Sequence, residues 1–599
     1  MTPVADPSPV DLGTPTAGEP RWRPSRLRMN PHGSWVMPGR GRVVLPALVA
    51  GIGLALSLPP WGWWILAFPA AGLLFWRLGG LRARTRLWAG WVAGIGLFGP
   101  GLIWARSFTL AGAIALIAFE ALTMGLACLV VPRGPVVARV LAFPAALTLT
   151  EAVRQTWPFG GLPLGGVFLG QAGGPLLGVA RLAGPLGLTA VVFLGGAACG
   201  ALGEGLARSW RDHGRIRSFR QHLAADTSSG SEQIGPGPEG LPLIMPVAMV
   251  RSDAEPTSPD TAHVSDRPWR GALAGHGGRL VAGVVAGVMV IAVGVLGDLA
   301  PDGGSSVGHI TTAAVQGGGS RGFRKSQIDP ATVLAAHVAA TETLARQTNG
   351  HGVDMVLWPE DVVSLGGPLT DDPELGALSN LARLLHTTLV VGVTEDVSTT
   401  AFRNEVVAFG PDGALVGRFE KVHRVPFGEY VPLRSLVAHL EDLTAVPRDA
   451  IPGRGSGLLV TPAAPLGTLV SFEVFYADRG RSSVRAGAEL LIVPTNTSSY
   501  TTAQVPTQEV AAAEVQAVTQ GRDLLQAAPT GYSAAVTNRG ALLQRSVLGT
   551  RQILRVTLHR RTGRTLFVST GPGPLLGLAG VALAAGWWCA RRRKHDTGS

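Results

Sequence analysis

The chain has 599 residues, of which 46% are hydrophobic and only 15% are charged. Because about a quarter of the residues in a soluble domain are charged, this composition excludes an ordinary soluble protein. The net charge of +11 is concentrated between apolar runs, so it indicates membrane topology rather than nucleic-acid binding.

Long apolar runs organise the first part of the chain. Residues 1–40 form a basic tail, and residues 41–207 contain six runs near the ~20 residues that a helix needs to cross a bilayer. Two further runs follow at 279–298 and 566–590. We therefore predict an α-helical membrane domain of about eight spans. The first six are expected at 43–58, 61–77, 88–105, 110–131, 137–153 and 184–206.

Arginine residues are concentrated in alternate loops. They lie in the N-terminal tail, after the second and fourth spans, between the sixth and seventh, and in the C-terminal tail 591–599. Because short cytoplasmic loops are rich in Arg and Lys, eight spans place all these segments on the cytoplasmic side. We expect a multi-pass protein of the cell membrane with both termini in the cytoplasm. Residues 305–560 would then be extracytoplasmic.

Two long segments lie outside the predicted spans. Residues 208–278 are rich in Ser, Pro, Gly and Asp and poor in aromatic residues, a composition that cannot bury a core. We predict a disordered cytoplasmic loop there. Residues 305–560 instead have the composition of a globular domain.

Residues 305–560 alternate β-branched runs with amphipathic stretches. Turn signals at Pro411-Asp412-Gly413 and Asn538-Arg539-Gly540 predict two hairpins. Strand–helix alternation combined with hairpins indicates a layered α/β domain whose helices cover the sheets. The predicted strands are 309–316, 354–360, 388–395, a run ending at Ser471, and 489–496, and the predicted helices are 331–347, 374–386, 479–487 and 506–526.

Three predicted strands end in polar side chains: Glu360, Lys421 and Ser471. A carboxylate, an ammonium group and a hydroxyl at sheet edges suit acyl transfer, in which the carboxylate moves protons and the ammonium stabilises the oxyanion. Taken singly, a Glu or Lys at such a position is usually a solvated surface group. Lys421 is more informative, because only three lysines occur among 51 basic residues, which indicates a need for a compact point charge.

The sequence resembles the apolipoprotein N-acyltransferases, which are membrane members of the nitrilase superfamily. The resemblance covers nearly the whole chain and rests on "LWPE", "EKVHRVPFGEYVPL", a nucleophile position followed by an aromatic residue and Glu, and "IVPTN". It implies a nitrilase-like layered sandwich for the extracytoplasmic domain. It also implies transfer of an acyl chain from a membrane phospholipid to the N-terminal amine of diacylglyceryl-cysteine in lipoproteins, through a covalent acyl-enzyme. We expect a monomer without cofactor, metal or nucleic-acid partner.

The resemblance also implies roles for individual residues. Glu360 matches the general base, Lys421 the oxyanion-stabilising lysine, and Ser471 the nucleophile position. Four further residues match positions that shape the site or bind substrate: Glu429, Glu473, Asn496 and Arg522.

Ser471 departs from the family pattern, which has Cys at this position. Cys128 and Cys199 lie in predicted spans and Cys589 at the inner end of the last, so residues 305–560 contain no cysteine. A hydroxyl is harder to ionise than a thiol of pKa ~8.5. A catalytically impaired relative that binds lipids or lipoproteins is therefore one alternative, and a membrane-tethered amidase is another. The complete acid–base set favours catalysis.

Overall fold

The computed structural model describes residues 41–107, 109–229, 267–319, 329–439, 443, 446–500 and 502–596, together with two short strands near the N-terminus. These strands, β1 (Arg28–Met29) and β2 (Trp35–Val36), pair antiparallel within a first unit, Met1–Leu45. The second unit, Pro46–Ser599, holds the remaining elements. Most of the predicted tail 1–40 lies outside the described residues.

A helix occupies the position of each predicted span. Within the described residues, five of these helices (α4 to α7 and α14) are long and apolar enough to cross a membrane, and two shorter apolar helices lie at Val43–Leu56 and Trp64–Leu78. Several apolar helices thus agree with the predicted membrane domain. The helices are α1 (Gly41–Leu56), α2 (Ala67–Leu78), α3 (Ala83–Gly101), α4 (Leu110–Val130), α5 (Val136–Arg154), α6 (Ala180–Ser229), α7 (Arg267–Leu299) and α14 (Gly573–Asp596).

Small residues allow some of these helices to pack closely. A Cβ atom at Gly51 of α1 would lie 2.0 Å from the carbonyl oxygen of Ala93 in α3, and a Cβ atom at Gly196 of α6 would lie 2.3 Å from the side chain of Ala71 in α2. Close backbone approach through small residues is typical of helix pairs in membranes. In contrast, large apolar side chains along α7 stay exposed, as a lipid-facing surface requires.

The predicted disordered loop 208–278 is helical at both ends. Helix α6 continues to Ser229, and α7 already begins at Arg267. Residues 208–225 contain a single Gly and no Pro and include five Arg residues, a residue type with good helix propensity. The composition that predicted disorder is therefore confined to the middle of the segment. Residues 230–266 lie outside the described residues.

Two mixed sheets form the globular domain. The eight-stranded sheet has the order β16–β3–β4–β6–β7–β8, with β5 beside β6 and β9 beside β7, and the six-stranded sheet runs from β10 to β15 in sequence order. Each sheet has a parallel centre: β3, β4 and β6 in the first, and β11, β12 and β13 in the second. The first sheet comprises β3 (Ser306–Gln316), β4 (Met355–Leu357), β5 (Val363–Leu365), β6 (Thr388–Asp396), β7 (Ala401–Phe409), β8 (Leu415–Glu420), β9 (Asp449–Ala450) and β16 (Gln552–Arg561). The second comprises β10 (Leu458–Val460), β11 (Pro465–Thr468), β12 (Leu490–Pro494), β13 (Leu524–Ala527), β14 (Ala534–Val536) and β15 (Leu542–Arg545).

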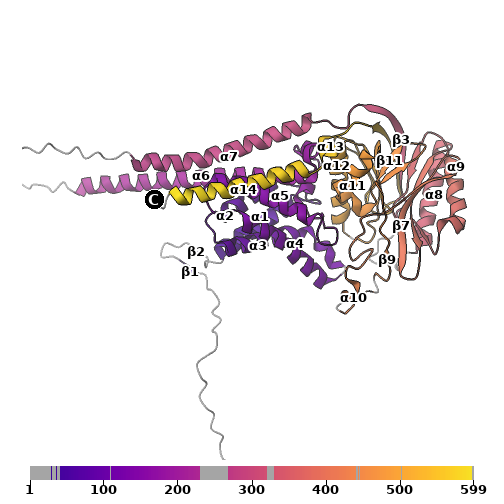
Figure 1. Cartoon of the computed structure of the whole chain (residues 1–599), viewed down its shortest axis with the longest axis horizontal. Coiled ribbons are helices and arrows are strands. Elements are labelled where there is room, and N and C mark those ends of the chain that lie inside the picture. Colours follow the sequence, from indigo (N-terminus) through magenta and orange to yellow (C-terminus); the bar gives the residue numbers. More distant parts are fainter. Residues whose placement is uncertain are drawn as a thin grey trace, which may run out of the picture. The chain divides into compact units, whose positions relative to one another are not determined.

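The sheets pack face to face and helices cover their outer faces. One apolar core joins the two sheets, with side chains such as Leu357 and Ile492. A second core lies between the first sheet and helices α8 (Pro330–Thr348) and α9 (Pro373–Leu385). Helices α11 (Ala477–Arg485) and α12 (Gln504–Gln520) contact the second sheet (Figure 1). The predicted layered α/β domain is confirmed.

Two predicted elements have different ends in the structure, and one strand was not predicted. The strand expected to end at Ser471 is β11, which ends at Thr468. The helix expected over 506–526 ends at Gln520, because Gly521 adopts a left-handed φ of 64° that caps it, and residues 524–527 form β13 instead. Strand β16, which pairs along the length of β3, was not predicted. Both predicted hairpins are confirmed, as β7–β8 and β14–β15.

Candidate active site

Ser471 lies at a sharp turn between a strand and a short helix. It follows β11 and begins the 3₁₀ helix η7 (Ser471–Phe475). Its φ of 51° is in the left-handed region, where a residue with a Cβ atom costs about 1–3 kcal/mol unless the surroundings hold it. The turn places Ser471 beyond the carboxyl ends of the parallel strands β11 to β13. Ligand sites in α/β sheets are found at this edge.

The carboxylate of Glu473 holds the turn in place. It is fully buried and accepts hydrogen bonds from the backbone N–H groups of Val470, Val422 and His423 at 2.9–3.0 Å. The guanidinium group of Arg479 lies 3.4 Å from one carboxylate oxygen. Three backbone donors and one cation thus surround the carboxylate. Glu473 therefore ties the turn to the segment that follows β8, and its role is positional.

Lys421 lies at the centre of a buried charged cluster. It follows β8, and its Nζ donates hydrogen bonds to Glu360 Oε1 at 2.8 Å and to Glu429 Oε1 at 2.6 Å. The amide of Asn404, in β7, donates to the same two oxygen atoms at 2.8 and 2.9 Å. Lys421 is 1% exposed and Glu360 is 4% exposed. The structure thus joins three residues singled out in the sequence and adds Asn404, which the sequence analysis missed.

The cluster contains one more carboxyl group than cations. Burial alone lowers the pKa of Lys421, but the attraction of Glu360 and Glu429 outweighs it, so the Lys421 pKa is raised and the ammonium stays charged. Burial raises the pKa of Glu360; the Lys421 cation opposes this rise, and the nearby acidic groups Asp361 and Glu429 add to it. The raised pKa favours the protonated form of Glu360, and general acid–base catalysis requires a group that can give and take a proton.

Ser471 contacts another carboxyl group through a threonine. Thr495 follows β12, and its Oγ1 lies 3.1 Å from Ser471 Oγ and 2.5 Å from Oε1 of Glu509 in α12. All three side chains are buried. Within the described residues, no hydrogen bond joins Ser471 directly to Glu360 or Lys421. Thr495 and Glu509 were missed, although Thr495 is the last residue but one of the predicted strand 489–496 and Glu509 is an acidic residue in a Val- and Ala-rich stretch.

Asn496 borders the site, whereas Arg522 does not. The Asn496 side chain accepts hydrogen bonds from the N–H and hydroxyl groups of Ser498. Arg522 precedes β13, at the opposite edge of the sheet from Ser471. A strand rises ~3.3 Å per residue, so about 15 Å separates the two edges. The prediction that Arg522 belongs to the site is corrected: it supports the fold by donating to the backbone carbonyls of Ala488, Gly521 and Gly563.

A loop between α5 and α6 contacts the segments that carry the site. Tyr476, directly after η7, donates a hydrogen bond to the Gly161 carbonyl at 2.8 Å. Tyr430, next to Glu429, donates to the Phe159 carbonyl at 3.1 Å. The membrane helices and the globular domain therefore meet beside the charged cluster.

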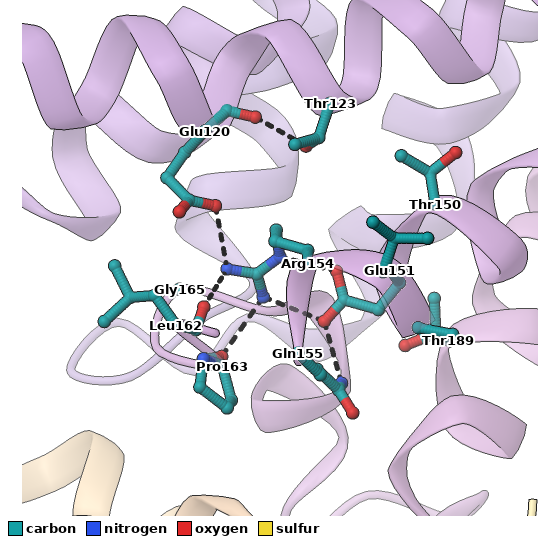
Figure 2. A network of polar contacts seen from close by, with 12 residues as sticks. Glu120, Thr123, Thr150, Glu151, Arg154, Gln155, Leu162, Pro163, Gly165 and Thr189 are labelled. Carbon is teal, nitrogen blue, oxygen red and sulfur yellow. Dashed lines mark hydrogen bonds and ion pairs between the residues drawn. The ribbon is translucent and has the colours of Figure 1, made fainter. Parts of the chain in front are cut away.

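Arg154 fixes this loop to the helices. Figure 2 shows its guanidinium group between the carboxylates of Glu120 in α4 and Glu151 in α5, with the loop carbonyls on its other side. The ion-pair distances are 3.3 Å to Glu120 and 2.8 Å to Glu151, and the Pro163 carbonyl accepts a hydrogen bond at 3.2 Å. Because Arg154 has five donors in a planar fork, it can hold several loop carbonyls and two carboxylates at once.

Two family models match the chain. The model described as "Apolipoprotein N-acyltransferase N-terminal domain" matches residues 50–198, which contain α2 to α5 and the loop after them. The model described as "Carbon-nitrogen hydrolase" matches residues 311–565, which contain both sheets, the Lys421 cluster and Ser471. The two matches together therefore include the apolar helices and the candidate site.

Curated relatives extend the similarity to most of the chain. The apolipoprotein N-acyltransferase of Shewanella oneidensis is 24% identical over 586 residues, covering 93% of this chain and 96% of that protein. The enzyme of the same name from Mycolicibacterium smegmatis is 28% identical over 561 residues, covering 90% of this chain and 84% of that protein. A third, from Geobacter metallireducens, is 33% identical over 208 residues, covering 34% of this chain and 40% of that protein.

Proposed function

Because the chain belongs to the apolipoprotein N-acyltransferases, we propose that it acylates the N-terminal amine of diacylglyceryl-cysteine in lipoproteins through an ester on Ser471. The acyl donor is a membrane phospholipid. The observation that carries this proposal is the placement of Ser471 in a strained turn at the sheet edge, beside a buried cluster of one ammonium and two carboxyl groups.

The first half-reaction forms the acyl-enzyme. Ser471 Oγ gives its proton to a buried carboxylate of the site and attacks the ester carbonyl carbon of the phospholipid. The carbonyl electron pair moves to oxygen, and the Lys421 ammonium stabilises the resulting oxyanion. The intermediate then expels the lysophospholipid oxygen, which takes a proton from Glu360. Asn404 and Glu429 keep Lys421 and Glu360 in position.

The second half-reaction transfers the acyl group to nitrogen. The α-amine of the lipoprotein attacks the ester carbon, and the ionised Glu360 takes the proton that the amine loses. Collapse of the second tetrahedral intermediate breaks the bond to Ser471 Oγ, which recovers its proton from the carboxyl group that took it in the first half-reaction. The products are an amide at the lipoprotein N-terminus and the original enzyme, so one phospholipid is consumed for each lipoprotein.

The reaction is tested with purified protein in phospholipid vesicles and a diacylated lipopeptide. We expect mass spectrometry to show the lipopeptide heavier by one acyl group and an equal amount of lysophospholipid. Release of a free carboxylic acid from a small amide would favour an amidase instead. Binding of lipopeptide without conversion would favour the catalytically impaired relative. A strain that lacks the gene and still carries the third acyl chain would contradict the proposed function.

We also propose eight membrane spans with the globular domain outside and both termini inside. Support comes from the helix at each predicted span and from the arginine-rich alternate loops. Reporter fusions after Gly230 and near Gly350 should report the cytoplasm and the exterior, respectively. Signals from the same side at both positions would contradict the eight-span topology. A monomer fits this proposal, since one chain supplies every residue of the site.

A further inference from the structure

We propose that Thr495 and Glu509 form a proton relay that activates the Ser471 hydroxyl as a nucleophile. This inference rests on the proposed function of Ser471 and adds two residues to it. It gives the serine proton a destination other than Glu360, whose Oε1 is occupied by Lys421 and Asn404.

The directions of the hydrogen bonds follow from the number of protons available. Thr495 Oγ1 lies within hydrogen-bond distance of both Ser471 Oγ and Glu509 Oε1, at 3.1 and 2.5 Å. A hydroxyl group has one proton to donate and can accept others. If Glu509 is ionised it can only accept, so Thr495 donates to Glu509 and Ser471 donates to Thr495. This arrangement directs the serine proton towards the carboxylate.

An acidic side chain is rarely buried as deeply as that of Glu509 unless it has a role at the site. The residue is 2% exposed, and its second oxygen, Oε2, is buried without a hydrogen-bond partner in the described part of the chain. A buried carboxyl group normally has partners for both oxygens, because each unsatisfied group costs stability. Helix α12 nevertheless presents Glu509 to Thr495 in the interior of the domain.

Burial also adjusts the proton affinity of Glu509. Loss of solvation raises its pKa to about 8; Glu360 adds to the rise, and the hydroxyl groups of Thr495 and Ser471 and the Lys421 cation oppose it. The charged and titratable groups that act on Glu509 are thus Glu360 and Lys421, with the phenol of Tyr500 also close enough to interact with it. An acceptor with a pKa near the working pH can take a proton and return it.

The relay keeps the buried charge constant. In the reactive form of the site that the relay requires, Glu360 holds a proton and Glu509 is ionised. During acylation the Ser471 proton passes to Thr495 while the Thr495 proton passes to Glu509, and Glu360 gives its proton to the lysophospholipid. During acyl transfer the amine proton goes to Glu360, and the Glu509 proton returns through Thr495 to Ser471. One negative charge therefore moves between two carboxyl groups, with no net change in a low-dielectric site.

A fluorophosphonate probe tests the relay without requiring a lipid reaction. Ser471 Oγ attacks the phosphorus atom and fluoride leaves, so the rate of labelling, measured from the intact mass, reports on activation of the serine alone. Thr495→Val and Glu509→Gln should slow labelling by about 10²- to 10⁴-fold, the usual contribution of general base catalysis. Thr495→Ser restores a hydroxyl at the same position and should label within about tenfold of the parent rate, a rescue that a packing role would not give.

The pH profile provides a second readout. The parent labelling rate should rise with pH and level off above about 8, because Glu509 must be ionised to accept the proton. Glu509→Gln should lose this inflection. The matched control is Glu514→Gln, which makes the same change further along α12 at a half-buried residue outside the site, and which should leave both rate and profile unchanged.

Each result separates the relay from the proposed function. If the parent protein labels rapidly and depends on Thr495 and Glu509, yet does not acylate lipopeptide, the proposed function fails and the relay stands. An unreactive parent serine, equal labelling in Glu509→Gln, or no rescue by Thr495→Ser would each overturn the relay. In Ser471→Cys, labelled with iodoacetamide, the loss caused by Glu509→Gln should fall below about tenfold, because a thiol ionises without such help.

Discussion

Replacing Ser471 with alanine should abolish acyl transfer and the acyl-enzyme. Alanine keeps the Cβ atom, so the left-handed turn at φ 51° is neither relieved nor made worse, and only the reacting oxygen is lost. We expect the fall to reach the detection limit, because no cysteine in the globular domain can take over. The measurement is lipopeptide mass together with intact-protein mass after incubation with phospholipid.

The corresponding cysteine variant tests the same position by replacing the hydroxyl group with a thiol. Ser471→Cys should keep or raise activity, because the thiol ionises more readily and its thiolate is the better nucleophile. The intermediate should change from an ester that resists hydroxylamine to a thioester that hydroxylamine cleaves. Glu360→Gln should be inactive in either background, since it keeps the shape of the side chain and removes the group that moves protons.

A control and two contrary results define the test. Ser483→Ala removes another buried hydroxyl, one that bonds the Gly480 carbonyl in α11, and should retain activity. Parent-level transfer in Ser471→Ala would remove the serine from the mechanism. An inactive parent protein that Ser471→Cys rescues would identify a relative that lost its chemistry at one atom.

The predictable residues of the site share a sequence signal. Glu360, Lys421 and Ser471 each follow a strand (β4, β8 and β11), and parallel strands bring their carboxyl ends to one edge of a sheet. A residue that directly follows a strand can therefore be placed at the edge of the sheet from the sequence alone. The prediction that Arg522 belongs to the site rests instead on the family resemblance. The structure places Arg522 at the amino end of β13, where it donates hydrogen bonds to backbone carbonyls.

The residues that were missed depend on packing between distant segments. Asn404 lies inside β7, and the period of a strand does not by itself say which face meets a lysine from the next strand. Glu509 reaches Thr495 only because α12 lies against the carboxyl end of β12. The turn at Ser471 contains no Gly or Asn, the residues that would indicate a positive φ in the sequence. Hydrogen bonds to Glu473, which join separate segments, hold the turn instead.

Removing the charge of Lys421 should affect both stability and activity strongly. Lys421→Met leaves Glu360 and Glu429 buried without their cation, and breaking a buried ion pair in this way costs about 3–5 kcal/mol. Loss of an oxyanion-stabilising group should lower turnover by at least about 10²- to 10³-fold. Lys421→Arg keeps the charge but not the compact ammonium geometry, so we expect better stability than Lys421→Met and little activity.

The loss of stability in Lys421→Met should depend on pH. Without the cation, burial and the neighbouring acidic groups raise the folded-state pKa of Glu360 above its ordinary value of about 4.5. The folded state then binds more protons than the unfolded state, so stability falls as pH rises above that value. Thermal unfolding of the purified protein should show a small difference from the parent at pH 4.5 and a larger one at pH 8.

A double variant separates the structural effect from the chemical one. Glu429→Gln added to Lys421→Met removes one of the unpaired charges, and should recover part of the lost stability while activity stays absent. Arg403→Met is the control, because it breaks an exposed ion pair with Glu420 on the same hairpin and should cost less than about 1 kcal/mol. Full transfer activity in Lys421→Met would contradict the oxyanion role. A double variant that regains activity along with stability would show that Lys421 acts only by holding the two carboxyl groups together.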